Sequence, residues 1–247
     1  MASLFAAIVL LWTVSVSNGI TNKGVFSTKT AYDWVVNTTA TIDEDQGMTI
    51  TYDGKTCNAI HVNMVGRHGY RNPGDDDMED FTKIRDALVA DMDPSSEYFA
   101  FLRDWVNRYD PQMEKMLVPR GREEWLGLGR RMAKRFKSLL RNESDAIELM
   151  SSDEERSKSS SKAFFAGLTE GLLGSSRTDR NPILSDPIIR FYDDCARYDE
   201  EVDDVEYPEV IKFKGSEHIA NVKNGIKTRL GLENVTITYG KYIIHFG

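Results

Sequence analysis

Two spacings of apolar residues recur along the chain, one with a period of two residues and one with the period of an α-helix. Ile60, Val62 and Met64 alternate with polar neighbours, which is typical of a β-strand. Apolar residues three or four positions apart predict buried helix faces instead. Three such stripes are Phe81, Ile84, Leu88 and Met92; Phe164, Leu168 and Leu172; and Ile219, Val222, Ile226 and Leu230. We expect these stripes to form the core rather than a site.

Further segments complete the predicted order of elements. The pattern predicts a basic helix over Glu123–Leu140 and a short strand over Ala146–Met150. The apolar contacts of this helix are Leu126, Met132, Phe136 and Leu140. We interpret the acidic run Asp199–Glu209 as a solvated loop without a metal ligand. The whole order predicts an α/β fold with a mostly parallel central sheet flanked by helices, and a helical cap over about residues 75–142.

The amino-terminal residues have the pattern of a secretory signal peptide. Leu4–Val16 is an almost unbroken apolar run, and as a helix it would rise about 20 Å, too little to span roughly 30 Å of hydrocarbon. Small residues at Ser17 and Gly19 suit cleavage after Gly19. We therefore predict a signal peptide over 1–19, an exported domain over 20–247 and no stable membrane anchor. An uncleaved anchor is the weaker alternative.

The charge balance excludes some classes of partner. Lysine and arginine total 31 against 39 aspartate and glutamate residues, which gives a formal net charge of −8. This balance argues against a general nucleic-acid binder and against binding to an anionic membrane surface. Any phosphorylated ligand must therefore meet a local site of positive charge.

Three glycosylation sequons and two cysteines fit an exported chain. The sequons lie at Asn37, Asn142 and Asn234. Cys57 and Cys195 could form one disulfide in an oxidising compartment. The alternative is that each is a small buried residue or has a partner outside this chain. The sequence leaves these alternatives open.

The strongest chemical signal follows the first predicted strand. There, Arg67, His68, Gly69, Arg71 and Pro73 form the pattern R-H-G-x-R-x-P. An imidazole can attack phosphorus and carry the phosphoryl group covalently, and planar guanidinium groups can bind the phosphoryl oxygens through paired hydrogen bonds. The carboxyl end of a strand is also where open α/β sheets place ligands. His68 is therefore a candidate nucleophile, with two arginines as candidate phosphate ligands. His61, toward the other end of the strand, is expected to be structural.

Together with this motif, three later segments resemble the histidine phosphatase superfamily, in its acid phosphatase and phytase branch, and most closely the multiple inositol polyphosphate phosphatases. They are Leu117–Phe136, with the pattern L-x-x-x-G and then L-G-x-R-x-x-x-R-[FY], Ser151–Phe164 and Phe191–Cys195. The likeness runs from about residue 57 to 232. It implies that His68 is the nucleophile that becomes phosphorylated. It also implies a pocket of three arginines that bind phosphate, Arg67, Arg71 and Arg156, with no metal or other cofactor.

The residues themselves give a second view of Arg156. It follows the predicted short strand and precedes a helix expected over 159–174, whose amino end would attract an anion. The alternative is a surface arginine paired with Glu154 or Glu155.

The sequence also departs from the family pattern. Family members carry, near the carboxyl end, a second histidine followed by a carboxylate, H-A-E or H-D, whose acid protonates the leaving group. His218 lies in a predicted helix and His245 in the final segment, and neither is followed by Asp or Glu. We therefore expect a truncated product, a splice form or an incomplete sequence. A further departure is the run of aspartates at 75–77, which we expect to cap a helix rather than act in the site.

Two functions remain open at this point. One is a secreted phosphatase that hydrolyses phosphomonoesters, with inositol polyphosphates as the substrates that the resemblance implies, through a phosphohistidine intermediate. The other is a non-catalytic secreted protein that keeps the phosphate pocket or only the fold. A transferase like the phosphoglycerate mutases uses the same arginine and histidine pair, but the export signal and the R-x-P extension argue against it. The sequence does not predict the oligomeric state.

Overall fold

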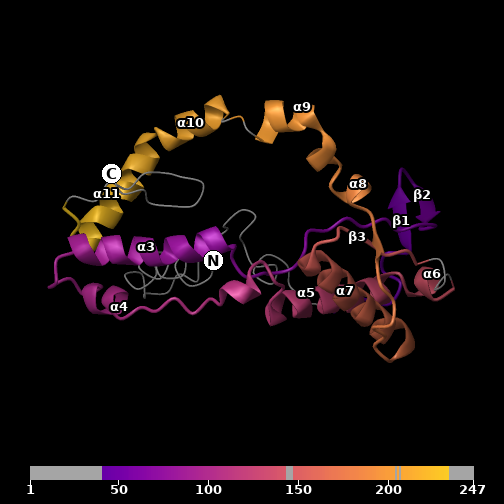
Figure 1. Cartoon of the computed structure of the whole chain (residues 1–247). Coiled ribbons are helices and arrows are strands. Elements are labelled where there is room, and N and C mark those ends of the chain that lie inside the picture. Colours follow the sequence, from indigo (N-terminus) through magenta and orange to yellow (C-terminus); the bar gives the residue numbers. More distant parts are fainter. Residues whose placement is uncertain (1–40, 143–146, 204, 206, 234–247) are drawn as a thin grey trace. The chain divides into compact units, whose positions relative to one another are not determined.

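A computed structural model of the chain describes four stretches, residues 41–142, 147–203, 205 and 207–233 (Figure 1). The described residues form two compact units. The first unit contains residues 41–72 and 115–194, and the second unit contains residues 73–114 and 195–233. The R-H-G-x-R motif up to Asn72 lies in the first unit.

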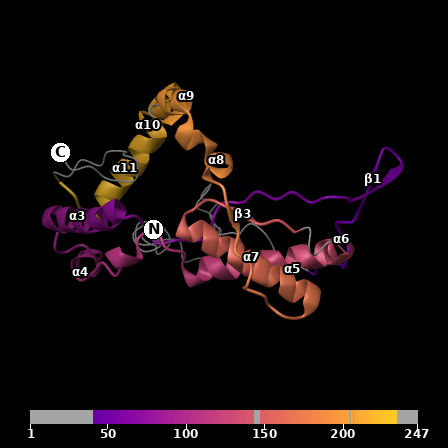
Figure 2. The ribbon, with the colours of Figure 1, turned by 45° about the vertical axis from the view of Figure 1, so that its right-hand side comes forward.

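Two helices, α5 (Pro119–Arg135) and α7 (Glu155–Leu173), lie side by side and form the body of the first unit (Figures 1 and 2). Their backbones approach closely because glycines face the partner helix. A Cβ atom on Gly167 would lie only 1.9 Å from the carbonyl oxygen of Leu126, and one on Gly129 only 2.2 Å from that of Phe164. The core around this contact consists of Ala133, Leu168 and Leu172, with Met132, Leu140, Ile147 and Phe164 packed against it.

The predicted helix over 123–140 forms as two helices, α5 and α6 (Lys137–Asn142). They are separated at Phe136, whose φ of −126° and ψ of 39° lie outside the helical range. A separate segment caps the second helix, since the backbone N–H of Ser138 donates to Asp45 Oδ1 at 2.7 Å. The Ser138 hydroxyl also bonds this carboxylate, and these bonds hold the pKa of Asp45 below its ordinary value. A cap from a distant segment cannot be predicted from the helix sequence.

The described residues contain two small sheets rather than a central one. Strands β1 (Thr49–Tyr52) and β2 (Lys55–Asn58) pair antiparallel around Asp53-Gly54, whose φ values of 48° and 69° suit a tight hairpin turn. Strands β3 (Met150–Ser151) and β4 (Ile183–Leu184) pair in parallel. The α/β class is confirmed, whereas the mostly parallel central sheet is not formed within the described residues.

The strand predicted over Ile60–Met64 was wrong, because residues 59–70 have no regular secondary structure. The side chain of Ile60 is 89% exposed and that of Val65 is 93% exposed. A strand exists only where a neighbour pairs with it, and no strand within the described stretches does so here. The alternation of apolar residues is real, but it does not supply that partner. The second predicted strand, over 146–150, coincides with β3 only at Met150.

Short helices complete the first unit after β4. They are α8 (Asp186–Ile189) and the 3₁₀ turn η5 (Phe191–Asp194). Asp186 also bonds the segment before α7, since its Oδ1 atom accepts the backbone N–H of Asp153 at 2.9 Å. This contact holds the chain after β4 beside the amino end of α7.

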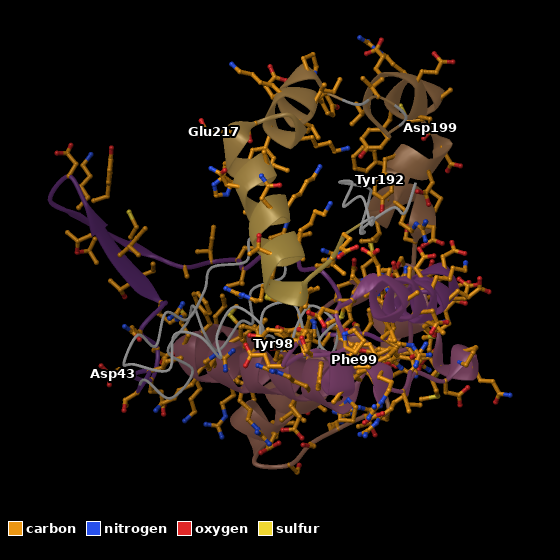
Figure 3. The ribbon with its side chains drawn as sticks, turned by 90° about the vertical axis from the view of Figure 1, so that its left-hand side faces the viewer. Asp43, Tyr98, Phe99, Tyr192, Asp199 and Glu217 are labelled. Atoms are coloured by element: carbon orange, nitrogen blue, oxygen red, sulfur yellow. The ribbon has the colours of Figure 1, made fainter. Side chains whose placement is uncertain are left out.

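The second unit is built on α3 (Asp75–Asp91) and α11 (Glu217–Leu230). The stripe predicted for the first helix is confirmed, because Phe81, Ile84, Leu88 and Met92 are all buried, with Met92 at the carboxyl-terminal cap of α3. The aspartates at 75–77 occupy its first turn, where Asp77 accepts the backbone N–H of Gly74 at 3.3 Å. They cap the helix as expected. In α11, whose first residue Glu217 is labelled in Figure 3, Ile219 and Leu230 are buried but Val222 is exposed.

Five shorter elements accompany them in the second unit. They are α4 (Phe99–Arg103), η3 (Pro111–Met113), α9 (Ala196–Tyr198), the π-helical turn η6 (Asp199–Asp203) and α10 (Pro208–Lys214). The acidic run 199–209 is therefore partly helical rather than a plain loop. Among the described residues, no group of three or more His, Cys, Asp or Glu side chains gathers as a metal site would require.

Several predictions fall outside what the structure describes. The signal peptide over 1–19, the sequons at Asn37 and Asn234 and the final His245 lie outside the described residues. Asn142 is the last residue of α6. The helical cap over about 75–142 is divided between the two units, so it remains a prediction. Within the described stretches, no helix is both long and apolar enough to cross a membrane.

Both cysteines are free thiols in this structure. Cys57 is exposed in β2, and Cys195 is partly buried. Because the two residues belong to different units, the disulfide between them remains a prediction.

Candidate active site

The R-H-G-x-R motif is held by backbone pairing with the segment that leads into α5. Tyr70 accepts the backbone N–H of Val118 at 2.9 Å, and the N–H of Asn72 donates to Met116 at 2.9 Å. The residues between them, Arg71 and Leu117, form an antiparallel bridge. The motif therefore lies against the amino end of α5, although residues 59–66 directly before it form no strand.

Glycines allow the motif to approach α5 and α7 closely. A Cβ atom on Gly69 would lie 2.5 Å from the carbonyl oxygen of Gly121, and one on Gly66 would lie 2.5 Å from the Trp125 ring. That ring packs edge-on against Phe164 of α7, with 5.8 Å between ring centroids. Gly69 and Gly121 are thus required by close packing of two backbone segments, and Gly66 by the Trp125 ring, rather than by a positive φ.

The imidazole of His68 is partly buried and oriented by its own backbone. Its Nδ1 atom lies 2.8 Å from the carbonyl oxygen of Gly69. Because a carbonyl can only accept, Nδ1 must carry the proton in this contact. In the neutral ring, Nε2 then keeps its lone pair, as a nucleophile requires.

All three predicted arginines act electrostatically on His68. Burial lowers the pKa of His68 most, the hydrogen bond with Gly69 opposes that shift, and the charges of Arg156, Arg67 and Arg71 lower the pKa further. The structure therefore brings together the four residues that the sequence singled out. Arg71 also donates from Nη1 to the carbonyl oxygen of Asn72 at 2.7 Å, while the side chain of Arg67 is exposed.

Arg156 lies in the first turn of α7 and is not a surface residue, since its side chain is only 19% exposed. Its Nη1 atom donates to Glu154 Oε2 at 2.6 Å, so the pairing with Glu154 that the alternative predicted is present. Its Nε atom is buried and has no hydrogen-bond partner among the described residues. Such a buried donor is costly when unpaired, and it would be satisfied by an anion that enters the site.

Glu154 and Arg190 extend this arrangement, and sequence reasoning did not assign either of them to the site. Arg190 donates from Nη1 to Glu154 Oε1 at 2.7 Å, and its Nε atom lies 2.5 Å from Asp193. Burial raises the pKa of Glu154, but the charges and hydrogen bonds of Arg156 and Arg190 outweigh it and hold that pKa below its ordinary value. A carboxyl group that stays ionised is poorly suited to donate a proton to a leaving group.

Ser160 is the third residue of the site that sequence reasoning missed. It is buried in α7, one helical turn after Arg156, and its hydroxyl bonds both the Arg156 carbonyl and the backbone N–H of Gly69. Serine occupies four of the five positions from 157 to 161. Nothing in the sequence distinguishes the one that faces the motif.

The remaining described histidines do not add to this cluster. His61 has an exposed side chain, and His218 is exposed on α11 in the second unit, with its ring centroid 6.4 Å from that of Phe213.

The model of the histidine phosphatase superfamily (branch 2) matches residues 60–228. This region includes the motif, Arg156 and helices α5 and α7, and it covers more than half of the chain. The chain belongs to branch 2 of the histidine phosphatase superfamily.

Two relatives from this superfamily are similar to part of the chain. Multiple inositol polyphosphate phosphatase 1 of Gallus gallus is 31% identical over 143 residues, which is 58% of this chain and 31% of the relative. Multiple inositol polyphosphate phosphatase 1 of Homo sapiens is 28% identical over 164 residues, or 60% of this chain and 34% of the relative. The match thus spans about a third of the length of each relative.

The superfamily match confirms the resemblance that the R-H-G-x-R motif and the later segments indicated.

Proposed function

We propose that the protein is a phosphatase that hydrolyses phosphomonoesters through a phosphohistidine on His68. One observation carries the proposal: a neutral imidazole with Nδ1 bonded to Gly69 lies within the field of Arg67, Arg71 and Arg156. The arginines offer the positive charge that a phosphoryl group needs in a protein whose net charge is −8. The Nε atom of Arg156, which has no hydrogen-bond partner among the described residues, is a donor that an anionic ligand would satisfy.

The reaction has two displacements at phosphorus. In the first, the Nε2 lone pair of His68 forms an N–P bond while the P–O bond to the leaving alcohol breaks, and the departing oxygen takes up a proton. In the second, the oxygen of a water molecule forms a P–O bond while the N–P bond breaks and its electron pair returns to Nε2 of His68. The proton that the water loses passes to a phosphate oxygen or to solvent, and inorganic phosphate leaves. The three arginines would stabilise the charge on the equatorial oxygens in both steps.

Inositol polyphosphates are the proposed substrates, because both reported relatives are named as multiple inositol polyphosphate phosphatases. Such ligands carry several phosphate groups and therefore need more positive charge than one phosphate does. Arg120 lies near the motif with its guanidinium carbon 5.1 Å from the centre of the Tyr70 ring, and it would add charge at the rim.

The test of this function is labelling of the protein with phosphate. The purified chain is mixed with ³²P-labelled phosphomonoester and quenched in alkali, in which phosphohistidine is stable. We expect His68→Ala to abolish both the trapped label and turnover, and the control His61→Ala, in the exposed segment before the motif, to leave both unchanged. Equal labelling of His68→Ala and the unmodified chain would exclude the mechanism.

A second candidate function is non-catalytic binding of phosphorylated ligands. It is favoured by the sequence observation that none of the four histidines is followed by Asp or Glu. Loss of general acid catalysis typically lowers a rate by ~10²–10⁴, but an aryl phosphate with an acidic phenol as leaving group needs little protonation. Rapid release of p-nitrophenol with slow hydrolysis of inositol phosphates would show an active nucleophile without an acid. Binding of inositol phosphates with no label from either substrate would support the non-catalytic function.

We also propose that the protein is exported, on the basis of the apolar segment at Leu4–Val16 and the three sequons. Expression in a eukaryotic secretory host should give a secreted product that begins at Ile20 and that loses mass on treatment with an N-glycosidase. A cell-retained product that still begins at Met1 would contradict this proposal.

A further inference from the structure

One hydroxyl joins the two parts of the candidate site. Ser160 is 3% exposed and lies in the interior of α7. Its Oγ atom accepts the backbone N–H of Gly69 at 3.0 Å and donates to the carbonyl oxygen of Arg156 at 2.7 Å. Gly69 comes directly after His68, so this hydroxyl contacts the nucleophile segment and the phosphate-binding segment at once.

The bonds continue from Ser160 to the imidazole. The N–H of Gly69 is held by Ser160, and its carbonyl oxygen accepts the Nδ1 proton of His68 at 2.8 Å. Three hydrogen bonds therefore connect the Arg156 carbonyl group in the first turn of α7 to the His68 ring, by way of the Ser160 hydroxyl and the Gly69 backbone. The last bond determines the imidazole tautomer, and it depends on where Gly69 is held.

Steric contacts make Gly69 sensitive to this bond. Its α-carbon lies so close to Gly121 that a Cβ atom would be 2.5 Å from the Gly121 carbonyl oxygen. The Gly121 backbone limits movement of Gly69 on one side, and Ser160 fixes the direction of its N–H on the other. Without the hydroxyl, the partly buried Gly69 N–H would lose this acceptor, and Gly69 would shift to relieve it.

A purely structural role for Ser160 has a ready comparison on the same helix. Serine and threonine in helices commonly bond the carbonyl four residues earlier, as Ser160 does. Thr169 does the same, with 3.0 Å to the carbonyl oxygen of Phe165, and its hydroxyl also accepts the backbone N–H of Arg177 at 2.9 Å. Both hydroxyls are buried and both tie another segment to α7, but only Ser160 leads to His68.

We infer that Ser160 is a positioning residue for the reaction, which holds Gly69 so that the His68 ring presents Nε2 in the correct tautomer while Arg156 stays in register with it. This inference rests on the proposed phosphoryl transfer to His68. Ser160 acts through Gly69 and is not itself expected to contact substrate.

The experiment compares Ser160→Ala and Ser160→Thr with Thr169→Val. The first readout is the single-turnover rate of His68 labelling from p-nitrophenyl phosphate, and the second is the ¹⁵N spectrum of the His68 ring, which reports its tautomer without any ligand. We expect Ser160→Ala to slow labelling by roughly tenfold and to change the ring spectrum. Ser160→Thr, which keeps the hydroxyl, should restore both. Thr169→Val should lower the thermal midpoint without changing either readout.

The outcomes separate this inference from the proposed function. If the unmodified chain is labelled and Ser160→Ala matches it in rate and ring spectrum, the inference is overturned and the function stands. If no chain is labelled but Ser160→Ala alone changes the ring spectrum, the function fails while the control of the His68 tautomer by Ser160 stands. If Thr169→Val alters the His68 spectrum as much as Ser160→Ala does, the effect is general to α7 and the inference is overturned.

Discussion

At the scale of single residues, the environment of His68 sets the pH range in which it can act. Burial and the charges of Arg156, Arg67 and Arg71 lower the pKa of His68, and the hydrogen bond with Gly69 only partly opposes them. In the proposed reaction the nucleophile is the neutral ring, so a lowered pKa would keep His68 reactive as the pH falls through about 6.5, where an ordinary histidine is half protonated. Reactivity would then be lost only below the pKa of His68 in the folded protein.

We predict that removal of Arg156 raises the pKa of His68 toward its ordinary value, because the charge of Arg156 lowers that pKa more than the charge of Arg67 or Arg71 does. Titration of the His68 ring by NMR in the free chain measures this directly. Arg156→Ala should shift the midpoint upward, and Arg71→Ala should shift it less. Arg122→Ala, which removes an exposed arginine of α5, is the control and should leave the midpoint in place. A midpoint at the ordinary value in the unmodified chain would contradict the prediction.

At the scale of the elements, the contact between α5 and α7 positions both Arg156 and Ser160 relative to the motif. This contact depends on glycine, because Cβ atoms at Gly129 and Gly167 would meet backbone atoms of the partner helix. Backbone atoms cannot move aside as the end of a flexible side chain can. Substitution there must separate the helices or strain them.

We therefore predict that Gly129→Ala and Gly167→Ala each lower the free energy of unfolding by about 1–3 kcal/mol, despite the better helix propensity of alanine. The matched control is Gly127→Ala in the same helix, where a Cβ atom would meet only the guanidinium end of Arg131 at 3.2 Å. That change should be neutral or stabilise by up to about 1 kcal/mol. Urea denaturation followed by circular dichroism compares the three variants. Equal stability at positions 127 and 129 would show that the helices do not pack as described.

The elements also show what the sequence could predict and what it could not. Helix stripes such as Phe81, Ile84 and Leu88 were predictable, because helical hydrogen bonds are local and the buried face repeats along the helix. The strand over Ile60–Met64 was not, because strand formation depends on a partner from elsewhere. The break at Phe136 was missed for the same reason, since the helix that follows is capped by the distant Asp45.

The candidate site divides in the same way. Arg67, His68 and Arg71 were predictable because their chemistry is concentrated in one short motif, whereas Arg156 needed the family resemblance to be chosen over a surface pairing. Ser160 and Arg190 could not be found, because their importance lies in contacts across 91 and 36 positions of sequence. The residue type and sequence neighbours of a serine or an arginine do not predict such a contact.

At the scale of the whole molecule, the first unit leaves large apolar side chains in contact with solvent. Ile60 is 89% exposed, Val65 is 93% exposed and Phe191 is 66% exposed. Exposed apolar patches and extended segments without a paired neighbour promote association between chains. The charge of −8 opposes association over long distances, but salt screens it within about 8 Å at physiological ionic strength.

We predict that the isolated chain self-associates and that the double variant Ile60→Lys, Val65→Lys shifts it toward the monomer. Because both side chains are already exposed, the variant should keep the circular dichroism spectrum and the thermal midpoint of the unmodified chain. Size-exclusion chromatography with light scattering, over a range of concentrations and at low and high salt, measures the shift. The contrasting control is Leu168→Lys, which places a charge at a buried position and should unfold the first unit instead. An unmodified chain that stays monomeric at every concentration and in high salt would mean that these side chains do not drive association.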